Sequence, residues 1–390
     1  MIPYIIAFTI SCFIVEIASA KFITSKIVRF FLSSLAVIVV SILAGLRDYT
    51  VGGEDTLGYG NFLFSGAVQS QELGDLSIYA TDAYISGEQG YLLLNFLVSR
   101  LTDNAHWFYF LLSLLTSGLA LTGIWLVRNY ASATFMWLTY LCTFYVLSFN
   151  ALRQSVSLSL ALCCIALTIR KRYFWALLAC AISMLFHTSG IVSFALFFAL
   201  WFLMRDGKHF LRNTLITIVI CAGILYGASY LLQPLADLLG YSNYLAPDAR
   251  SGQELGGEVL YRLVPLFFGI PIMFTALNRE QTMPKQNLTK SELDKSQNQT
   301  PGWLNLGSLL VLLLIEMILL PLRIISYPVY RVLLYFSCAK VMAYSYIVSF
   351  ISSSRWVWNL GLIVFNSAYF YFVVIERNSG WYTSSLLGLY

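Results

Sequence analysis

Residues 105–127 read AHWFYFLLSLLTSGLALTGIWLV and carry no lysine, arginine, aspartate or glutamate. About 20 consecutive apolar residues are enough for a helix to cross a bilayer, so this stretch is long enough to span a membrane. Similar stretches recur through the 390 residues, of which 58% are hydrophobic and only 11% are charged, against roughly 25% charge in a soluble domain. The composition therefore predicts a polytopic membrane protein and excludes a soluble domain, a disordered chain and a nucleic-acid-binding protein.

The apolar runs predict one all-α integral membrane domain over residues 1–390, a transmembrane helical bundle with about 12 spans. The predicted spans are 3–19, 30–46, 105–127, 131–149, 151–169, 173–187, 189–204, 213–232, 259–277, 303–320, 329–350 and 356–375. We expect the shorter apolar piece 91–104 to be re-entrant or interfacial, because Arg100 and Asp103 interrupt it. Thr188-Ser189-Gly190 is the expected break within 173–204, although one long tilted helix would also fit.

The first apolar run resembles a signal peptide because it ends in Ala18-Ser19-Ala20. No positive charge precedes this run, however, and Glu16 interrupts it. These two features favour a retained spanning helix over a cleaved signal.

The loop charges predict which side of the membrane each loop faces. Basic residues concentrate in cytoplasmic loops. If both termini are extracytoplasmic, most of the 24 basic residues fall in inner loops and most of the 19 acidic residues in outer loops. Basic and acidic loops then alternate along the whole chain. Residues 47–90 and 233–258 become long extracytoplasmic loops, and the polar segment 278–302 becomes a flexible cytoplasmic loop.

Several cationic or titratable residues lie near the outer ends of their spans. They are Arg47, Arg153, His187, Arg262, Arg323 and Arg331. An ionisable residue inside a span costs at least ~2.5–3.5 kcal/mol on insertion scales, so it usually faces a partner or a cavity. One arginine near a helix end ordinarily reaches up to the headgroups. Several at one depth indicate a cationic cavity for a phosphate or diphosphate, because guanidinium groups bind oxyanions bidentately.

The deeper charged residues Glu16, Glu316 and Lys340 are predicted within the membrane. The sequence leaves open whether they pair with other residues or line a pathway.

The first outer loop contains the glycine-rich segment Val51-Gly52-Gly53-Glu54-Asp55. Its glycines permit tight turns and close backbone approach. Asp55 could bind a sugar hydroxyl, act as a base, or cap a helix that begins at Thr56.

Five short motifs follow one another between about residues 40 and 340. They are Arg47…Val51-Gly52-x-x-Asp55-Thr56-x-x-Tyr59, Glu88-x-Gly90-Tyr91…Asn95, Asn150-x-x-Arg153-Gln154, Phe186-His187-x-Ser189 and Tyr330-Arg331…Tyr335-Phe336. No single motif is specific, but the ordered set resembles the EpsG family. That family belongs with the Wzy-like polysaccharide polymerases of bacterial capsule, exopolysaccharide and O-antigen pathways.

The resemblance implies a multi-pass enzyme of the bacterial inner (plasma) membrane that joins lipid-linked oligosaccharide repeat units at the outer face. The glycan on undecaprenyl diphosphate would be transferred onto a second lipid-linked unit, with the diphosphate as leaving group. Stabilising the charge of that leaving group should be a large catalytic term, and a base would deprotonate the acceptor hydroxyl. Membrane lipid, a chain-length regulator and a flippase of the same pathway are the expected partners, and no cofactor, metal or nucleic acid is required.

Two groups of residues are predicted to form the site. The catalytic group is Arg47, Asp55, Glu88, Arg153, His187 and Arg331. The substrate-binding group is Tyr59, Tyr91, Asn150, Gln154, Arg262, Arg323 and Tyr327. Arg153 and Arg331 are expected to bind the diphosphate with support from Arg47. Asp55, Glu88 and His187 compete for the role of base, with histidine having the more suitable ordinary pKa.

Three other functions would use similar features. An O-antigen ligase or another lipid-phosphosugar glycosyltransferase would need the same cationic cavity and would differ in its acceptor. A flippase for lipid-linked oligosaccharides should carry polar groups through the full depth and often repeated halves. In this sequence the unusual basic residues cluster toward one face, with only Glu16, Glu316 and Lys340 deeper, and there is no internal repeat. A membrane acyltransferase would centre on a histidine facing a cytoplasmic donor, whereas His187 is expected to be outside.

The predicted sidedness is testable with single cysteines at Asp55 and Lys290. A membrane-impermeant thiol reagent applied to intact cells should label Asp55→Cys and leave Lys290→Cys unlabelled. Labelling of both positions, or the reverse pattern, would contradict the predicted topology.

Overall fold

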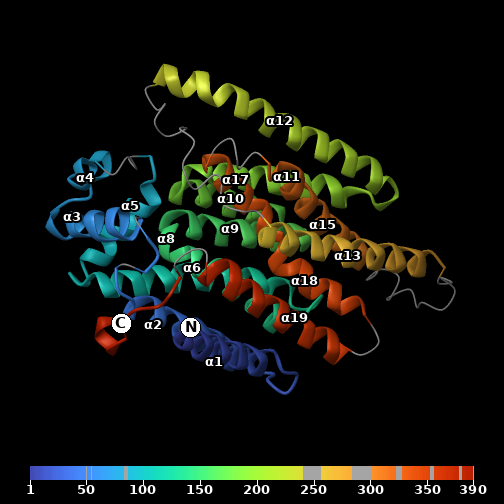
Figure 1. Ribbon diagram of the computed structural model, residues 1–390, viewed down its shortest axis with the longest axis horizontal. Coiled ribbons are helices and arrows are strands. Elements are labelled where there is room, and N and C mark those ends of the chain that lie inside the picture. The colour runs from blue at the N-terminus through green and yellow to red at the C-terminus, as the bar shows by residue number, and fades with distance from the viewer. Residues whose placement is uncertain are drawn as a thin grey trace.

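Helix α9 (Leu152–Ile169) lies at the centre of the helical bundle in the computed structural model (Figure 1). Of the residues in this helix, 94% are buried. Helices α6 (Ala105–Val127), α10 (Tyr173–Phe186) and α11 (Val192–Arg205) pack against it. Its alanine, serine and cysteine side chains are small, which lets neighbouring helix backbones approach closely.

The structure describes most of the chain. The described residues are 1–49, 51–53, 55–82, 87–239, 256–282, 301–321, 327–351, 355–376 and 380–389. Of the predicted site residues, Arg323 lies outside these ranges, and Tyr327 is placed only as the first residue of a helix, without its side chain.

The remaining elements are also helical, and the part of the chain that is described contains no β-strand beyond one isolated bridge between Ser384 and Leu389. The longer helices are α1 (Ile2–Ser19), α2 (Lys26–Leu46), α12 (Phe210–Leu239), α13 (Gly256–Thr282), α15 (Gly302–Leu319), α17 (Tyr327–Ser337), α18 (Ala339–Phe350) and α19 (Arg355–Tyr369). The shorter ones are η1 (Thr56–Phe62), α3 (Leu63–Gln69), α4 (Leu76–Asp82), α5 (Gln89–Ser99), α7 (Ala133–Tyr140), η2 (Leu141–Tyr145), α8 (Leu147–Asn150), η3 (Thr188–Ile191), η4 (Gly207–His209), η8 (Phe370–Ile375) and η9 (Ser385–Leu387). The all-α prediction is confirmed.

Nine helices within the described ranges are long and apolar enough to cross a membrane. Each of the predicted spans overlaps a helix. The predicted span 131–149 consists of three consecutive pieces, α7, η2 and α8, and α10 has only 14 residues. The chain is therefore a multi-pass membrane protein by length and composition, while the count of twelve and the side that each end faces stay predictions.

The chain breaks at the expected position between α10 and α11. Helix α10 ends at Phe186, and the 3-10 turn η3 follows His187. A Cβ on Gly190 would lie 2.6 Å from the backbone of Ser183, so only glycine fits this return of the chain against α10.

The predicted loops are partly helical. Residues 47–90 contain η1, α3 and α4, and α5 then covers part of the piece expected to be re-entrant. With 11 residues, α5 is too short to span a bilayer. Helix α12 extends to Leu239 and α13 runs from Gly256 to Thr282, so both are longer than their predicted spans, and 240–255 and 283–300 lie outside the described residues.

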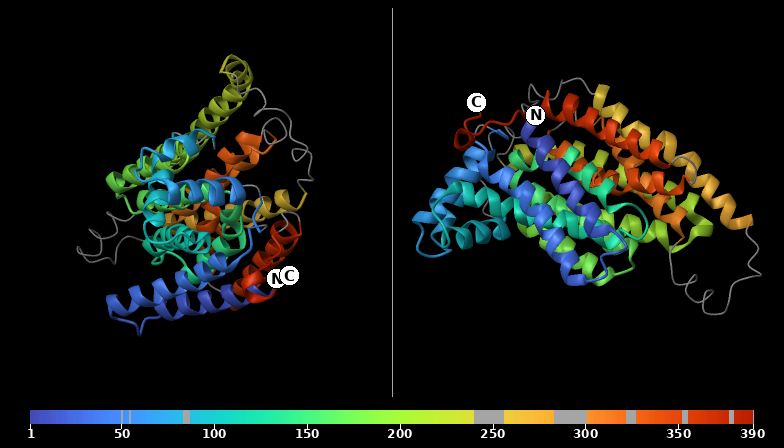
Figure 2. Two further views of the ribbon diagram at one scale, coloured as in Figure 1. Left: turned by 90° about the vertical axis from the view of Figure 1, so that its left-hand side faces the viewer. Right: turned by 90° about the horizontal axis from the view of Figure 1, so that it is seen from below.

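The two ends of the chain meet at one end of the bundle (Figure 2). The rings of Tyr4 and Tyr382 lie 5.6 Å apart. The Tyr382 hydroxyl donates to the Leu43 carbonyl over 2.8 Å, and the Asp48 carboxylate accepts the Ser385 N–H over 2.9 Å. The C-terminal segment 380–389 is thus packed on the end of α2.

A buried ionic cluster joins α13, α15 and α18. Arg262 Nε lies 2.5 Å from Glu316 Oε1, and Lys340 Nζ lies 3.8 Å from the same oxygen. The Ser337 hydroxyl also donates to Glu316, which is fully buried. Two of the deeper charges, Glu316 and Lys340, are therefore pairing residues, whereas Glu16 is exposed and accepts a hydrogen bond from Thr134.

Substituting Glu316→Gln should destabilise the protein by about 3–5 kcal/mol, because it removes the buried carboxylate charge that both Arg262 and Lys340 contact. The apparent Tm of the purified protein in detergent should fall clearly. Glu16→Gln, which removes an exposed carboxylate, is the matched control and should change the Tm little. An unchanged Tm for Glu316→Gln would show that the cluster does not hold these helices together.

Candidate active site

Arg47 anchors the first loop to the junction between α8 and α9. Its guanidinium lies between the rings of Tyr109 and Phe149, with its carbon 4.4 and 4.5 Å from the two ring centroids. It also donates to the carbonyls of Val51 and Phe149 and to the Thr56 hydroxyl. With only 1% of its surface exposed, Arg47 is enclosed by protein groups.

Gly52 brings the loop close enough for this anchor. Its φ of +108° is a conformation that residues with a side chain rarely adopt. A Cβ there would lie 2.6 Å from the Phe149 carbonyl. The glycines of the loop therefore serve the close backbone approach that the sequence predicted.

A second buried arginine pairs with the carboxylate that precedes α5. Arg153 Nη1, in the first turn of α9, lies 2.5 Å from Glu88 Oε2. The other Glu88 oxygen accepts the Thr188 N–H over 3.2 Å, at the start of η3. Three segments distant in sequence thus meet at one carboxylate.

Burial changes the acidity of this carboxylate. It raises the pKa of the Glu88 carboxyl above its ordinary range, and the charge of Arg153 opposes this effect. A carboxylate with a raised pKa is a stronger base, which suits proton abstraction near neutral pH.

Aromatic side chains form the next layer of the site. The Arg153 guanidinium carbon lies 3.7 Å from the centroid of the Tyr59 ring. The Tyr91 hydroxyl donates to the Tyr59 carbonyl over 2.8 Å, and the Asn95 amide donates to the Tyr91 carbonyl over 2.9 Å. Tyr59 therefore contacts the cation directly, and Tyr91 supports Tyr59.

Gln154 in α9 and Arg331 in α17 are the last two motif residues of the site. The Gln154 amide donates to the Arg331 carbonyl over 2.7 Å. The charge of Arg331 acts on both Glu88 and His187. Arg153 and Arg331 consequently lie on two different helices around the same carboxylate.

His187 is held as a neutral ring with its Nδ1 already in use. Nδ1 accepts the Ser189 N–H over 3.1 Å and lies 2.7 Å from the Ser189 hydroxyl. Because Nδ1 accepts the Ser189 N–H, this nitrogen carries no proton. A neutral ring that accepts at Nδ1 carries its proton on Nε2, so this histidine is set up as a hydrogen-bond donor.

Asp55 and Asn150 belong to the wall of the site. The Asn150 side chain accepts the Asp55 N–H over 3.3 Å. Helix η1 begins at Thr56 as expected, but the Asp55 side chain makes no capping hydrogen bond to it. Asp55 therefore occupies the position of a cap without acting as one.

The structure gathers most of the predicted residues and separates one of the described ones. Those around the buried pair are Tyr59, Glu88, Tyr91, Arg153, Gln154, His187 and Arg331. Arg262 belongs instead to the Glu316 cluster.

The sequence prediction missed a chain of hydroxyl groups beside His187. The Tyr335 hydroxyl lies 3.0 Å from the Ser189 hydroxyl and 2.7 Å from that of Ser157, which in turn lies 2.5 Å from the Ser183 hydroxyl. Tyr335 and Ser189 belong to the quoted motifs, and this is the sequence feature from which their place in the site could have been predicted.

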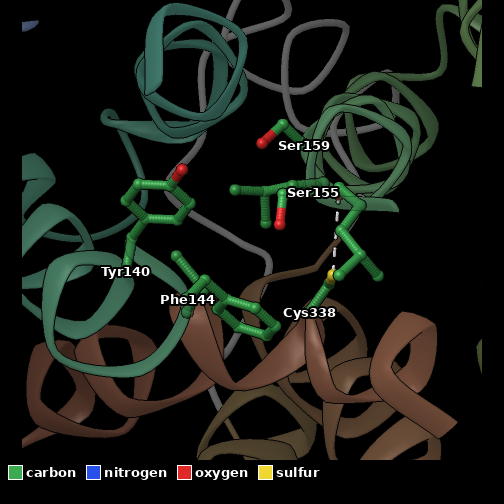
Figure 3. A pocket seen from close by; sticks show the side chains of 8 residues that line it. Tyr140, Phe144, Ser155, Ser159 and Cys338 are labelled. Carbon is green, nitrogen blue, oxygen red and sulfur yellow. Dashed lines mark hydrogen bonds between the residues drawn. The ribbon is translucent and has the colours of Figure 1, made fainter. Parts of the chain in front are cut away.

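A separate interior cavity is too small to take part in substrate binding. Figure 3 shows it between Tyr140, Phe144, Ser155, Ser159 and Cys338. Its volume is about 10 Å³, which leaves room for one water molecule at most. A sugar or a phosphate does not fit there.

The fold and the site define a polytopic helical membrane protein with paired charges buried at one end of its bundle. No group of three or more His, Cys, Asp or Glu side chains that could hold a metal ion occurs in the described ranges. The chain belongs to the EpsG family, which matches it over residues 5–386. Membership implies a role in exopolysaccharide biosynthesis. No curated protein and no solved structure matches the chain.

Replacing Arg47→Lys should destabilise the protein by about 2–3 kcal/mol, because an ammonium group cannot serve several acceptors between two rings. The Tm in detergent reports this change. Arg128→Lys is the matched control, since Arg128 also packs on a ring and donates to a carbonyl but is only half-buried. Equal Tm values for the two variants would contradict the anchoring role.

Proposed function

We propose that the protein is a polymerase that joins lipid-linked oligosaccharide repeat units at the extracytoplasmic face of the inner membrane. The observation that carries this proposal is the buried ion pair of Arg153 and Glu88, with Arg331 near enough for its charge to act on Glu88. An anionic leaving group needs cations that are in place before the reaction. An acceptor hydroxyl needs a base nearby. Family membership supports the same pathway.

In the proposed reaction, the diphosphate of the donor lipid binds Arg153 and Arg331. Because Arg153 then turns to the diphosphate, Glu88 Oε2 loses its cationic partner and can accept a proton, while Oε1 keeps the Thr188 N–H. The bond between the anomeric carbon and the diphosphate oxygen breaks, and the acceptor hydroxyl oxygen bonds to that carbon. The proton of the hydroxyl goes to Glu88, and the lipid diphosphate leaves as an anion held by the two arginines.

Among the three candidate bases, Glu88 is favoured by its contacts. His187 Nδ1 is occupied by Ser189, and its other nitrogen carries the proton. Asp55 is tied through its backbone to Asn150, in the wall of the site. We assign His187 as a donor that orients substrate oxygens, and Arg47 as a positioning residue for the loop that carries Tyr59.

A strain lacking this protein should accumulate lipid-linked single repeat units and make no long polymer. Expressing Arg153→Ala or Glu88→Gln in this strain should leave the protein in the membrane without polymer. Arg153→Ala removes a cation that binds the diphosphate, and Glu88→Gln removes the general base, which costs roughly 10²–10⁴-fold in rate. The measurements are a gel of extracted polysaccharide, mass spectrometry of the lipid-linked fraction and a membrane immunoblot.

Arg100→Ala is the matched control, since Arg100 lies exposed at the end of α5 and bonds the carbonyls of Ala67 and Ser70. It should restore polymer. Normal polymer that stays on the carrier lipid in the deletion strain would instead indicate a ligase. Single units confined to the cytoplasmic leaflet would indicate a flippase.

A further inference from the structure

A groove lies between the first loop and the start of α6, beside α3. We call it the Tyr49 groove. Its polar lining consists of Tyr49, Asn61, Ser65, Asp103, Asn104 and His106. Its volume is about 570 Å³, within the range of roughly 300–1,000 Å³ that is usual for small-ligand sites.

An aromatic surface forms one wall of the groove. The Tyr49 ring stacks on the His106 ring at 5.4 Å, with 23° between the planes, and Tyr49 is 38% exposed. His106 Nδ1 donates to the Gly45 carbonyl over 2.8 Å, which leaves Nε2 as the acceptor of the neutral ring. The exposed ring face offers an apolar platform next to a hydrogen-bond acceptor.

The other lining residues are the polar Asn61, Ser65, Asp103 and Asn104 and the apolar Phe64, Val68 and Ala105. Asn61, Ser65 and Asp103 can exchange hydrogen bonds with hydroxyl or amide groups of a ligand. None of the described residues that line the groove is a lysine or an arginine. A phosphate or a carboxylate would find no cation there and would meet the Asp103 charge. The groove is therefore suited to a ligand rich in hydroxyl groups and free of negative charge.

The position of the groove relates it to the buried pair. Helix η1 carries Tyr59, which packs on Arg153, and two residues later Asn61, which lines the groove. The Tyr109 hydroxyl lies 2.7 Å from Asn61 Oδ1 and 3.0 Å from the Thr56 carbonyl. Tyr109 also packs on Arg47. Arg47 therefore holds both the groove wall and the first loop, which lies beside the Glu88–Arg153 pair.

We propose that the Tyr49 groove is a subsite for neutral or amino sugars of the glycan, separate from the diphosphate site. This rests on the proposed function, because the glycan is the substrate of that reaction. A sugar packs one face on Tyr49 and bonds its hydroxyl groups to Asn61, Asp103 and His106. The groove thus selects repeat units whose bound sugar lacks a negative charge.

The test uses the full-length protein in nanodiscs and the soluble repeat-unit oligosaccharide, free of lipid and phosphate, released from the strain's own polysaccharide. Binding is measured by saturation-transfer NMR and by titration. Tyr49→Ala should weaken binding by roughly three- to tenfold, the loss expected for one ring contact, and should shorten the polymer made in cells. Tyr49→Phe keeps the ring and should bind as the wild type does. Trp381→Ala removes an exposed ring at the same end of the bundle and is the control.

The outcomes separate the groove from the polymerase reaction. Arg153→Ala should bind the oligosaccharide normally while making no polymer. If Arg153→Ala still makes polymer but Tyr49→Ala loses binding, the proposed reaction is wrong and the groove assignment stands. If the wild type does not bind the oligosaccharide, or Tyr49→Ala binds it equally well, the groove assignment is overturned whatever the polymer phenotype.

Discussion

The ion pair between Glu88 and Arg153 is the interaction on which the organisation of the site depends. It connects the start of α5, the first turn of α9 and, through the Thr188 N–H, the turn between α10 and α11. In a buried setting the cost of desolvating two charges can exceed their attraction, so such a pair is weak evidence for stability alone. In the proposed reaction the pair opens to receive an anionic substrate, so the buried charges serve substrate binding. The reaction therefore begins when Arg153 exchanges Glu88 for the diphosphate.

The Glu316 cluster is a useful contrast. It also contains buried charges, but three cationic or hydroxyl donors converge on a single carboxylate oxygen within packed helices. Such convergence fixes the relative positions of α13, α15 and α18. The two clusters show that burial of charge alone does not distinguish a binding site from a structural link. The difference lies in which neighbours could be exchanged for a ligand.

Much of the fold could be predicted because a spanning helix is a local property of the sequence. Each apolar run that predicted a span overlaps a helix, and the break after His187 falls at the expected residue. The gathering of Tyr59, Glu88 and Arg153 agrees with their place in the ordered motifs. The role of Arg47 did not, since a depth estimate cannot tell a cation facing a cavity from one enclosed by two rings. The partner of Arg262 was equally hidden, because Glu316 lies 54 residues away in the chain.

The packing of the C-terminal segment on α2 has a consequence for biogenesis. Tyr382 lies 339 residues after Leu43, and Ser385 lies 337 residues after Asp48, yet these residues contact each other. The hairpin of α1 and α2 must therefore wait, through the synthesis of the intervening residues, for these contacts. Until then the nascent hairpin exposes a surface that the insertion machinery or lipid has to cover, so ribosome stalling late in the message would leave the first loop unfinished.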